Sequence, residues 1–223
     1  MVYLLPILAV ILSFIFVYFT KPKSEKSIKL LLAFSGAFLL ALTFFELLPD
    51  VYEDLSPKSA AIFILAGILL QIFLEFFSKG AEHGHVHMAT KKNRFPVVLF
   101  LSLSLHALVE GVPVTNGDTI IYGILVHKIP VAIILSIFLL NSNLKLALSV
   151  LFIGLFALMT PLGSLLTQES FVVSTYSAQL TALAIGVFLH ISTVVLFESA
   201  QGHAFNLRKL VVIVLGIVIA YFL

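Results

Sequence analysis

The chain has 223 residues, of which 61% are hydrophobic and 11% are charged, and its mean hydropathy is +1.16. These values exclude an ordinary water-soluble domain and predict an integral membrane protein. The apolar runs reach about twenty residues without strand-like alternation, so we expect an all-α fold rather than a membrane barrel. The absence of cysteine excludes disulfides and thiolate metal sites. The net charge of +2 says little about a partner, and we expect the lipid bilayer as surroundings and no nucleic-acid partner.

Eight apolar stretches of membrane-spanning length follow one another along the chain. They cover Tyr3–Thr20, Ser27–Pro49, Ala60–Ser78, Phe95–Val114, Thr119–Leu140, Leu144–Thr167, Ser177–Phe197 and Leu207–Leu223. The first stretch has no basic segment before it and no small-residue cleavage pattern after it, so we interpret it as a helix rather than a signal peptide. We therefore expect one eight-helix membrane domain over residues 1–223.

The basic residues sort cleanly to one side of this arrangement. Eleven of the thirteen lie in the loops or at the span ends of one side, while Lys58 lies on the other side and Lys128 within a span; the eleven are Lys21, Lys23, Lys26, Lys29, Lys79, Lys91, Lys92, Arg94, Lys145, Arg208 and Lys209. Because cytoplasmic loops carry the excess of Lys and Arg, we expect the loop at about residues 79–94 inside the cell and both termini outside. This predicts a multi-pass protein of the cell membrane.

The second and seventh spans share a short stretch of similar sequence. Gly36-Ala37-Phe38-Leu39 is followed by Thr43 and Glu46, and Gly186-Val187-Phe188-Leu189 by Thr193 and Glu198. The two spans run in opposite directions across the membrane, which is typical of an inverted-topology repeat. We therefore expect a 3+2+3 arrangement, in which helices one to three and six to eight are the repeats around a central hairpin.

The fourth and fifth spans carry the most polar intramembrane cluster. His106 lies nine residues before Thr115 at the turn, and His127 lies equally far beyond it, so the two imidazoles should share a depth of about 14 Å. Glu110 follows His106 by four residues and therefore shares its helix face. Two imidazoles and a carboxylate at the membrane centre predict a functional site, and these groups can bind one divalent transition-metal ion with water.

Prolines accompany this cluster in both helices. Pro113 and Pro130 each remove a backbone hydrogen bond, which would free the carbonyls of Val109 and Val126. Broken helices at the membrane centre are how transporters expose ion ligands. The alternative interpretation is that the two histidines only link their helices by hydrogen bonds.

These motifs resemble the ZIP (Zrt/Irt-like) family of divalent-metal transporters. The family's fourth helix typically shows His-x-x-x-Glu-Gly, and its fifth shows a His followed closely by Pro-Glu-Gly. The matching stretches are residues 104–111, 127–130, 46–50, 157–163 and 186–190. The resemblance follows the whole chain in order, and it implies metal transport through a site formed by the fourth and fifth helices.

The chain departs from the family pattern where many members bind a second metal ion. The departures are Ala107, Lys128, Val131 and Thr160, where the family commonly has Asn, Asp or Asn, Glu and Glu. The resemblance therefore implies one ion held by His106, Glu110 and His127. The Lys128 ammonium would take the second ion's place and balance Glu110.

Three further groups are candidate parts of a metal pathway. His83, His85 and His87 lie in the expected cytoplasmic loop, where they could capture metal or simply belong to a solvated linker. Glu46, Asp50, Glu53 and Asp54 lie at the expected outer mouth, where carboxylates would concentrate cations. His190 in the seventh span is either a pathway residue or a structural one.

We therefore expect a transporter of divalent transition-metal ions into the cytoplasm. Zinc is the first expectation, followed by iron, manganese, cobalt or nickel, and the ion is the transported substrate rather than a cofactor. The alternatives are a non-transporting metal-sensing relative and an intramembrane metallohydrolase. The sequence lacks the His-Glu-x-x-His motif of such hydrolases, so we expect no enzyme. The sequence leaves open whether the protein forms a homodimer.

Overall fold

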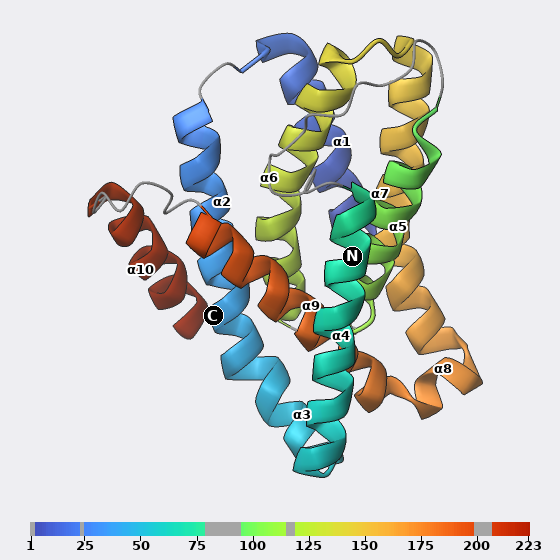
Figure 1. The fold of residues 1–223 in the computed structure, drawn as a ribbon, viewed down its shortest axis with the longest axis vertical. Coiled ribbons are helices and arrows are strands. Elements are labelled where there is room, and N and C mark those ends of the chain that lie inside the picture. The colour runs from blue at the N-terminus through green and yellow to red at the C-terminus, as the bar shows by residue number, and fades with distance from the viewer. Residues whose placement is uncertain (1–2, 23–24, 79–94, 115–118, 199–206) are drawn as a thin grey trace.

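The computed structural model describes residues 3–22, 25–78, 95–114, 119–198 and 207–223, and within these ranges every element is a helix (Figure 1). The elements are α1 (Leu4–Thr20), α2 (Glu25–Leu42), a π-helical turn (Thr43–Leu47), α3 (Leu48–Asp54), α4 (Pro57–Ser78), α5 (Val97–Gly111), α6 (Ile120–Asn141), α7 (Leu146–Glu169), α8 (Phe171–Thr175), α9 (Ser177–Glu198) and α10 (Leu207–Tyr221). The predicted all-α class is confirmed for these residues.

Five of the described helices are long and apolar enough to cross a membrane, judged by length and composition. They cover Ser27–Asp54, Pro57–Ser78, Ile120–Asn141, Leu146–Glu169 and Ser177–Phe197. α1 and α5 are apolar but shorter. The chain is therefore a multi-pass membrane protein, while the count of eight spans, the orientation and the inverted repeat stay predictions.

The second predicted span is longer than expected. We expected it to end at Pro49, but α2, the π-turn and α3 follow without a break to Asp54, which makes one long rod beside α10 (Figure 1). The amide of Leu48 bonds to the carbonyl of Thr43, five residues back, so the turn holds an extra residue just before the proline. Such π-turns absorb local irregularities in a helix, and Pro49 then occupies the first turn of α3, where a missing N–H is tolerated.

The prolines of the central hairpin also differ from the expectation. α5 ends at Gly111, so Pro113 follows the helix, and the carbonyl of Val109 accepts a hydrogen bond from Val112 N at 3.1 Å. The prediction that Pro113 frees this carbonyl was therefore wrong. Pro130 lies inside α6, as expected, and the helix continues on both sides of it.

Three clusters of buried apolar residues form the core, α6 contributes to each, and the two larger ones bear on the placement of its polar residues. The first contains Leu39 and Leu42 of α2, Ile64 of α4, Ile121 and Ile124 of α6, and Ile185 and Phe188 of α9. The second contains Val10 of α1, Leu103 of α5, Leu135 of α6, and Phe152 and Phe156 of α7. His127 and Lys128 lie on α6 between the segments that enter these clusters, so the polar residues are placed where the two clusters meet.

Glycines allow two helix pairs to cross in backbone contact. A Cβ added at Gly67 of α4 would lie 1.9 Å from the carbonyl oxygen of Leu183 in α9, and one at Gly163 of α7 would lie 2.0 Å from that of Leu108 in α5. Any larger residue would have to push the helices apart. Close crossings at small residues are how membrane helices pack tightly, so α4 is held against α9 and α5 against α7 (Figure 1).

Candidate metal centre

The structure brings together the two histidines and the glutamate that the sequence predicts as a cluster in the central hairpin. His106 and Glu110 of α5 and His127 of α6 each offer one ligand atom, and these atoms lie within 4.8 Å of one another. All three side chains are at most 2% exposed. Among the described residues, this is the group of His, Cys, Asp and Glu side chains that could hold a metal ion.

The separations within the group suit a small divalent ion. Glu110 Oε1 lies 3.1 Å from His106 Nε2 and 3.5 Å from His127 Nε2. Ligands bound to a tetrahedral zinc ion at about 2.1 Å lie about 3.4 Å from one another. The carboxylate oxygen is therefore spaced from each of the two imidazole nitrogens nearly as such an ion requires.

The other carboxylate oxygen of Glu110 faces Lys128. The ammonium of Lys128 forms a buried ion pair with Glu110 Oε2, and the lysine is 1% exposed. Its Nζ also lies over the ring of Phe156, 5.2 Å from the centroid, which is a favourable place for a cation. Glu110 thus divides its two oxygens between the histidine side and the lysine side. This pairing balances the charge of a carboxylate that would otherwise be costly to bury.

Gln71 of α4 completes the surroundings of His106. Its Oε1 lies 3.1 Å from His106 Nδ1, and the glutamine is fully buried. Because an amide oxygen only accepts, this contact places the imidazole proton on Nδ1 and leaves the lone pair on Nε2 facing Glu110. Two electron-pair donors 3.1 Å apart repel each other unless a proton or a metal ion lies between them, so the neutral imidazole and Glu110 together offer a place for a cation.

The accessory positions have structural roles. Ala107 and Val131 are buried apolar residues of the second cluster. Thr160 of α7 donates its hydroxyl to the carbonyl of Ala107 at 2.9 Å, which links α7 to α5. None of these three supplies a carboxylate or imidazole, so the Lys128 side of Glu110 lacks ligands for a second ion.

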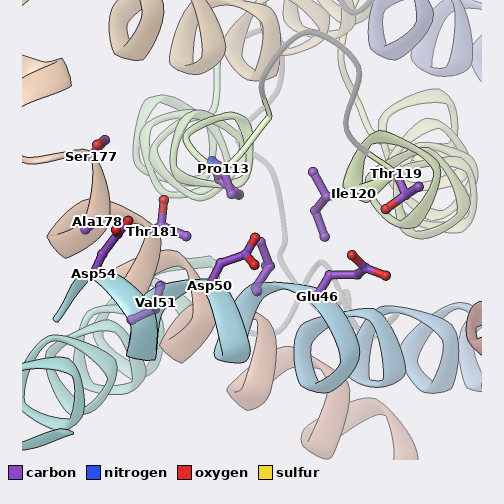
Figure 2. A pocket seen from close by; sticks show the side chains of 11 residues that line it. Glu46, Asp50, Val51, Asp54, Pro113, Thr119, Ile120, Ser177, Ala178 and Thr181 are labelled. Carbon is purple, nitrogen blue, oxygen red and sulfur yellow. The ribbon is translucent and has the colours of Figure 1, made fainter. Parts of the chain in front are cut away.

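An acidic cavity of about 520 Å³ lies near the C-terminal end of the α2–α3 rod. It is lined by Glu46, Leu47, Asp50, Val51, Asp54, Pro113, Thr119, Ile120, Ser177, Ala178 and Thr181. Figure 2 shows the three carboxylates on one stretch of helix, with Pro113 and Ile120 across from them. Their spacing of four residues puts them on one helix face. Glu53, which we also expected at the mouth, is not among the lining residues because it lies off that face.

The remaining predicted residues have different outcomes. His190 of α9 lies 2.6 Å from Glu75 of α4, measured from Nε2 to Oε2, so it is not part of the metal centre. His83, His85 and His87 lie outside the described residues. Gln71 was missed in the sequence because a glutamine has no ligand motif. The available signal was the pair of polar residues one turn apart, Gln71 and Glu75, in an otherwise apolar helix.

The chain is similar to three curated proteins. Zinc transporter ZIP1 of Danio rerio is 35% identical over 122 residues, which cover 50% of this chain and 40% of the relative. Protein zntD of Dictyostelium discoideum is 30% identical over 153 residues, covering 57% and 22%. Zinc transporter ZIP1 of Takifugu rubripes is 29% identical over 147 residues, covering 60% and 49%. The chain thus spans less than half the length of each of these relatives.

No family model matches the chain. Two of the relatives carry the names of zinc transporters rather than enzymes, in agreement with the expectation of a non-enzymatic protein. All three support the resemblance seen in the helix motifs, and two of them carry ZIP1 in their names.

Proposed function

We propose that the protein carries a divalent transition-metal ion, zinc before others, across the membrane and into the cytoplasm. The observation that carries this proposal is the convergence of His106, Glu110 and His127 from two helices into the buried core, with spacings that suit one ion. Ionisable groups are costly to bury in membrane spans, so their presence there indicates a path for ions or protons. The printed names of two relatives support zinc as the ion.

The ion would enter through the acidic cavity. Glu46, Asp50 and Asp54 supply three carboxylates to one space that also contains Pro113, at the end of the hairpin that holds the metal centre. A cluster of negative charge in a partly enclosed space raises the local concentration of cations. This side would face outward, as the distribution of Lys and Arg predicts.

At the centre, the ion would be held by two neutral imidazoles and one carboxylate oxygen. Gln71 keeps the Nε2 lone pair of His106 directed at the ion, and Lys128 holds the other oxygen of Glu110. The centre would therefore be mononuclear. A hydrolase would need a carboxylate free to act as a base, and Glu110 is already shared between the histidines and the lysine, so transport is favoured.

The test is zinc uptake into proteoliposomes containing the purified chain. His106→Ala, Glu110→Ala and His127→Ala should each abolish saturable uptake, because each removes one of three ligands, while the protein still inserts. Glu169→Ala is the matched control, since this exposed carboxylate ends α7 away from the centre. Uptake at the parent rate in two of the three ligand variants would contradict the proposed site. Tight zinc binding without any flux in the parent would instead favour a metal-sensing relative.

A further inference from the structure

A second polar contact lies next to the metal centre and is used by nothing described so far. Glu75 of α4 and His190 of α9 are joined at 2.6 Å, between Oε2 and Nε2. Their side chains are 28% and 15% exposed, so the pair is partly accessible, unlike the metal centre. A carboxylate and an imidazole are also the two kinds of ligand that the metal centre contains.

The position of this pair connects it to the centre. Gln71 contacts His106, and Glu75 lies four residues further along α4, which is about 6 Å along the helix axis on the same face. The end of α4 at Ser78 follows within one more turn, before the loop that carries His83, His85 and His87 in the sequence. The pair therefore lies between the centre and the end of α4 that is expected to face the cytoplasm.

The two helices that carry the pair are fixed relative to each other. Gly67 and Gly186 place α4 and α9 in backbone contact: a Cβ at Gly186 would lie 2.0 Å from the carbonyl oxygen of Ile64. His190 lies one turn beyond Gly186, and Glu75 two turns beyond Gly67. The ligand atoms are thus presented from a rigid helix pair, with their spacing set by packing rather than by a loop.

We propose that Glu75 and His190 form a second, weaker binding site for the transported divalent ion, on the route from the metal centre to the cytoplasmic side. This inference rests on the proposed function and extends it. On binding, the ion displaces the proton shared by Nε2 and Oε2, which leaves to solvent if the imidazole is protonated or moves to Nδ1 if it is neutral, and Nε2 and Oε2 move apart from 2.6 Å to about 3.4 Å. Two protein ligands hold an ion more weakly than three, which suits release.

The alternative is that the pair only ties α4 to α9. Glu75→Gln separates the two roles, because an amide can still hydrogen-bond to the imidazole but is a poor ligand for a transition metal. His190→Gln is the reciprocal variant. Glu169→Gln is again the matched control, with the same change of charge at an exposed helix end.

The first experiment measures Co²⁺ binding to the full chain in detergent, by equilibrium dialysis and visible absorption. The metal centre is removed with His106→Asn and His127→Asn together, and one weakly bound Co²⁺ should remain. Adding Glu75→Gln or His190→Gln should weaken this remaining binding by about tenfold or more, because one of two ligands is lost. Remaining binding that is unchanged by both variants, or absent before them, would overturn the inference.

The second experiment measures zinc uptake with the metal centre intact. Glu75→Gln should lower the maximal rate several-fold and leave the concentration for half-maximal uptake unchanged, because loading at the centre is not affected. If Glu75→Gln lowers the midpoint of thermal unfolding but leaves metal binding and zinc flux normal, the pair only stabilises the packing of α4 against α9. This result would also overturn the inference. Failure of the proposed function is distinguishable, since the parent would then show no zinc uptake at all, or uptake would persist in the His106, Glu110 and His127 variants.

Discussion

Lys128→Met removes the ammonium that faces Glu110 and leaves a side chain of similar length. Lys128 and Glu110 are 1% and 2% exposed, so the usual screening of surface ion pairs by water does not apply. Removing one partner of a buried ion pair costs about 3–5 kcal/mol, because the other charge is left buried alone. We therefore expect the metal-free variant to be less stable than the parent by about that amount.

The same substitution should strengthen metal binding. An ion on the histidine side of Glu110 would lie about 5 Å from the ammonium, where each unit of its charge is repelled by about 3 kcal/mol at an effective dielectric constant of 20. Each 1.4 kcal/mol changes the dissociation constant tenfold, so even part of this repulsion corresponds to about a hundredfold gain in affinity. Saturating zinc should then recover most of the lost stability, because the ion replaces the missing cation.

The measurements are thermal unfolding in detergent with and without zinc, and zinc binding by calorimetry. Lys145→Met is the matched control, since Lys145 is exposed before α7 and should leave both quantities unchanged. Lys128→Asp goes one step further, because it adds a carboxylate and should allow a second ion to bind per chain. A Lys128→Met variant with the parent's stability and the parent's affinity would refute the reasoning on charge balance.

Three other predictions concern the surroundings of the centre. Gln71→Leu should weaken zinc binding by about 10–100-fold in calorimetry, because the imidazole loses the partner that sets its tautomer; unchanged affinity would assign Gln71 to packing alone. Gly163→Ala should lower the thermal midpoint by the equivalent of about 1–3 kcal/mol, since its Cβ would meet the carbonyl of Leu108 at 2.0 Å, whereas Gly154→Ala, with nothing within 4 Å, should be tolerated. Deleting residues 82–89 should raise the zinc concentration for half-maximal uptake but leave flux measurable, and complete loss of flux at normal expression would contradict this.

Helix geometry explains why the three residues of the centre could be predicted. The four-residue step from His106 to Glu110 fixes a shared face, and equal distances from one turn place His127 at the same depth. These relations are local to one hairpin. Whether the three residues bind metal is a separate question, which the variants above address.

The features that sequence reasoning missed all depend on contacts between distant segments or on backbone detail. Gln71 reaches His106 across 35 residues, and only the packing of α4 against α5 brings them together. Pro49 looked like a helix end, but a π-turn lets the helix continue past it. Glu53 shares the acidic composition of its neighbours, yet its helix face turns it away from the cavity they line.

The ion pair between Lys128 and Glu110 favours release of a bound ion, because the ammonium and the ion compete for the same carboxylate. Lys128 cancels the carboxylate's charge before any ion arrives, so the centre of His106, Glu110, His127 and Lys128 is close to neutral in the metal-free state. A dication would then be attracted mainly by two neutral imidazoles, in competition with the ammonium for the same carboxylate. Such a centre binds less tightly than one with two carboxylates, because it offers less negative charge in a buried place. In the proposed transport cycle, Lys128 would re-form its pair with Glu110 as the ion leaves, which stabilises the empty state and keeps the buried charge balanced at each step.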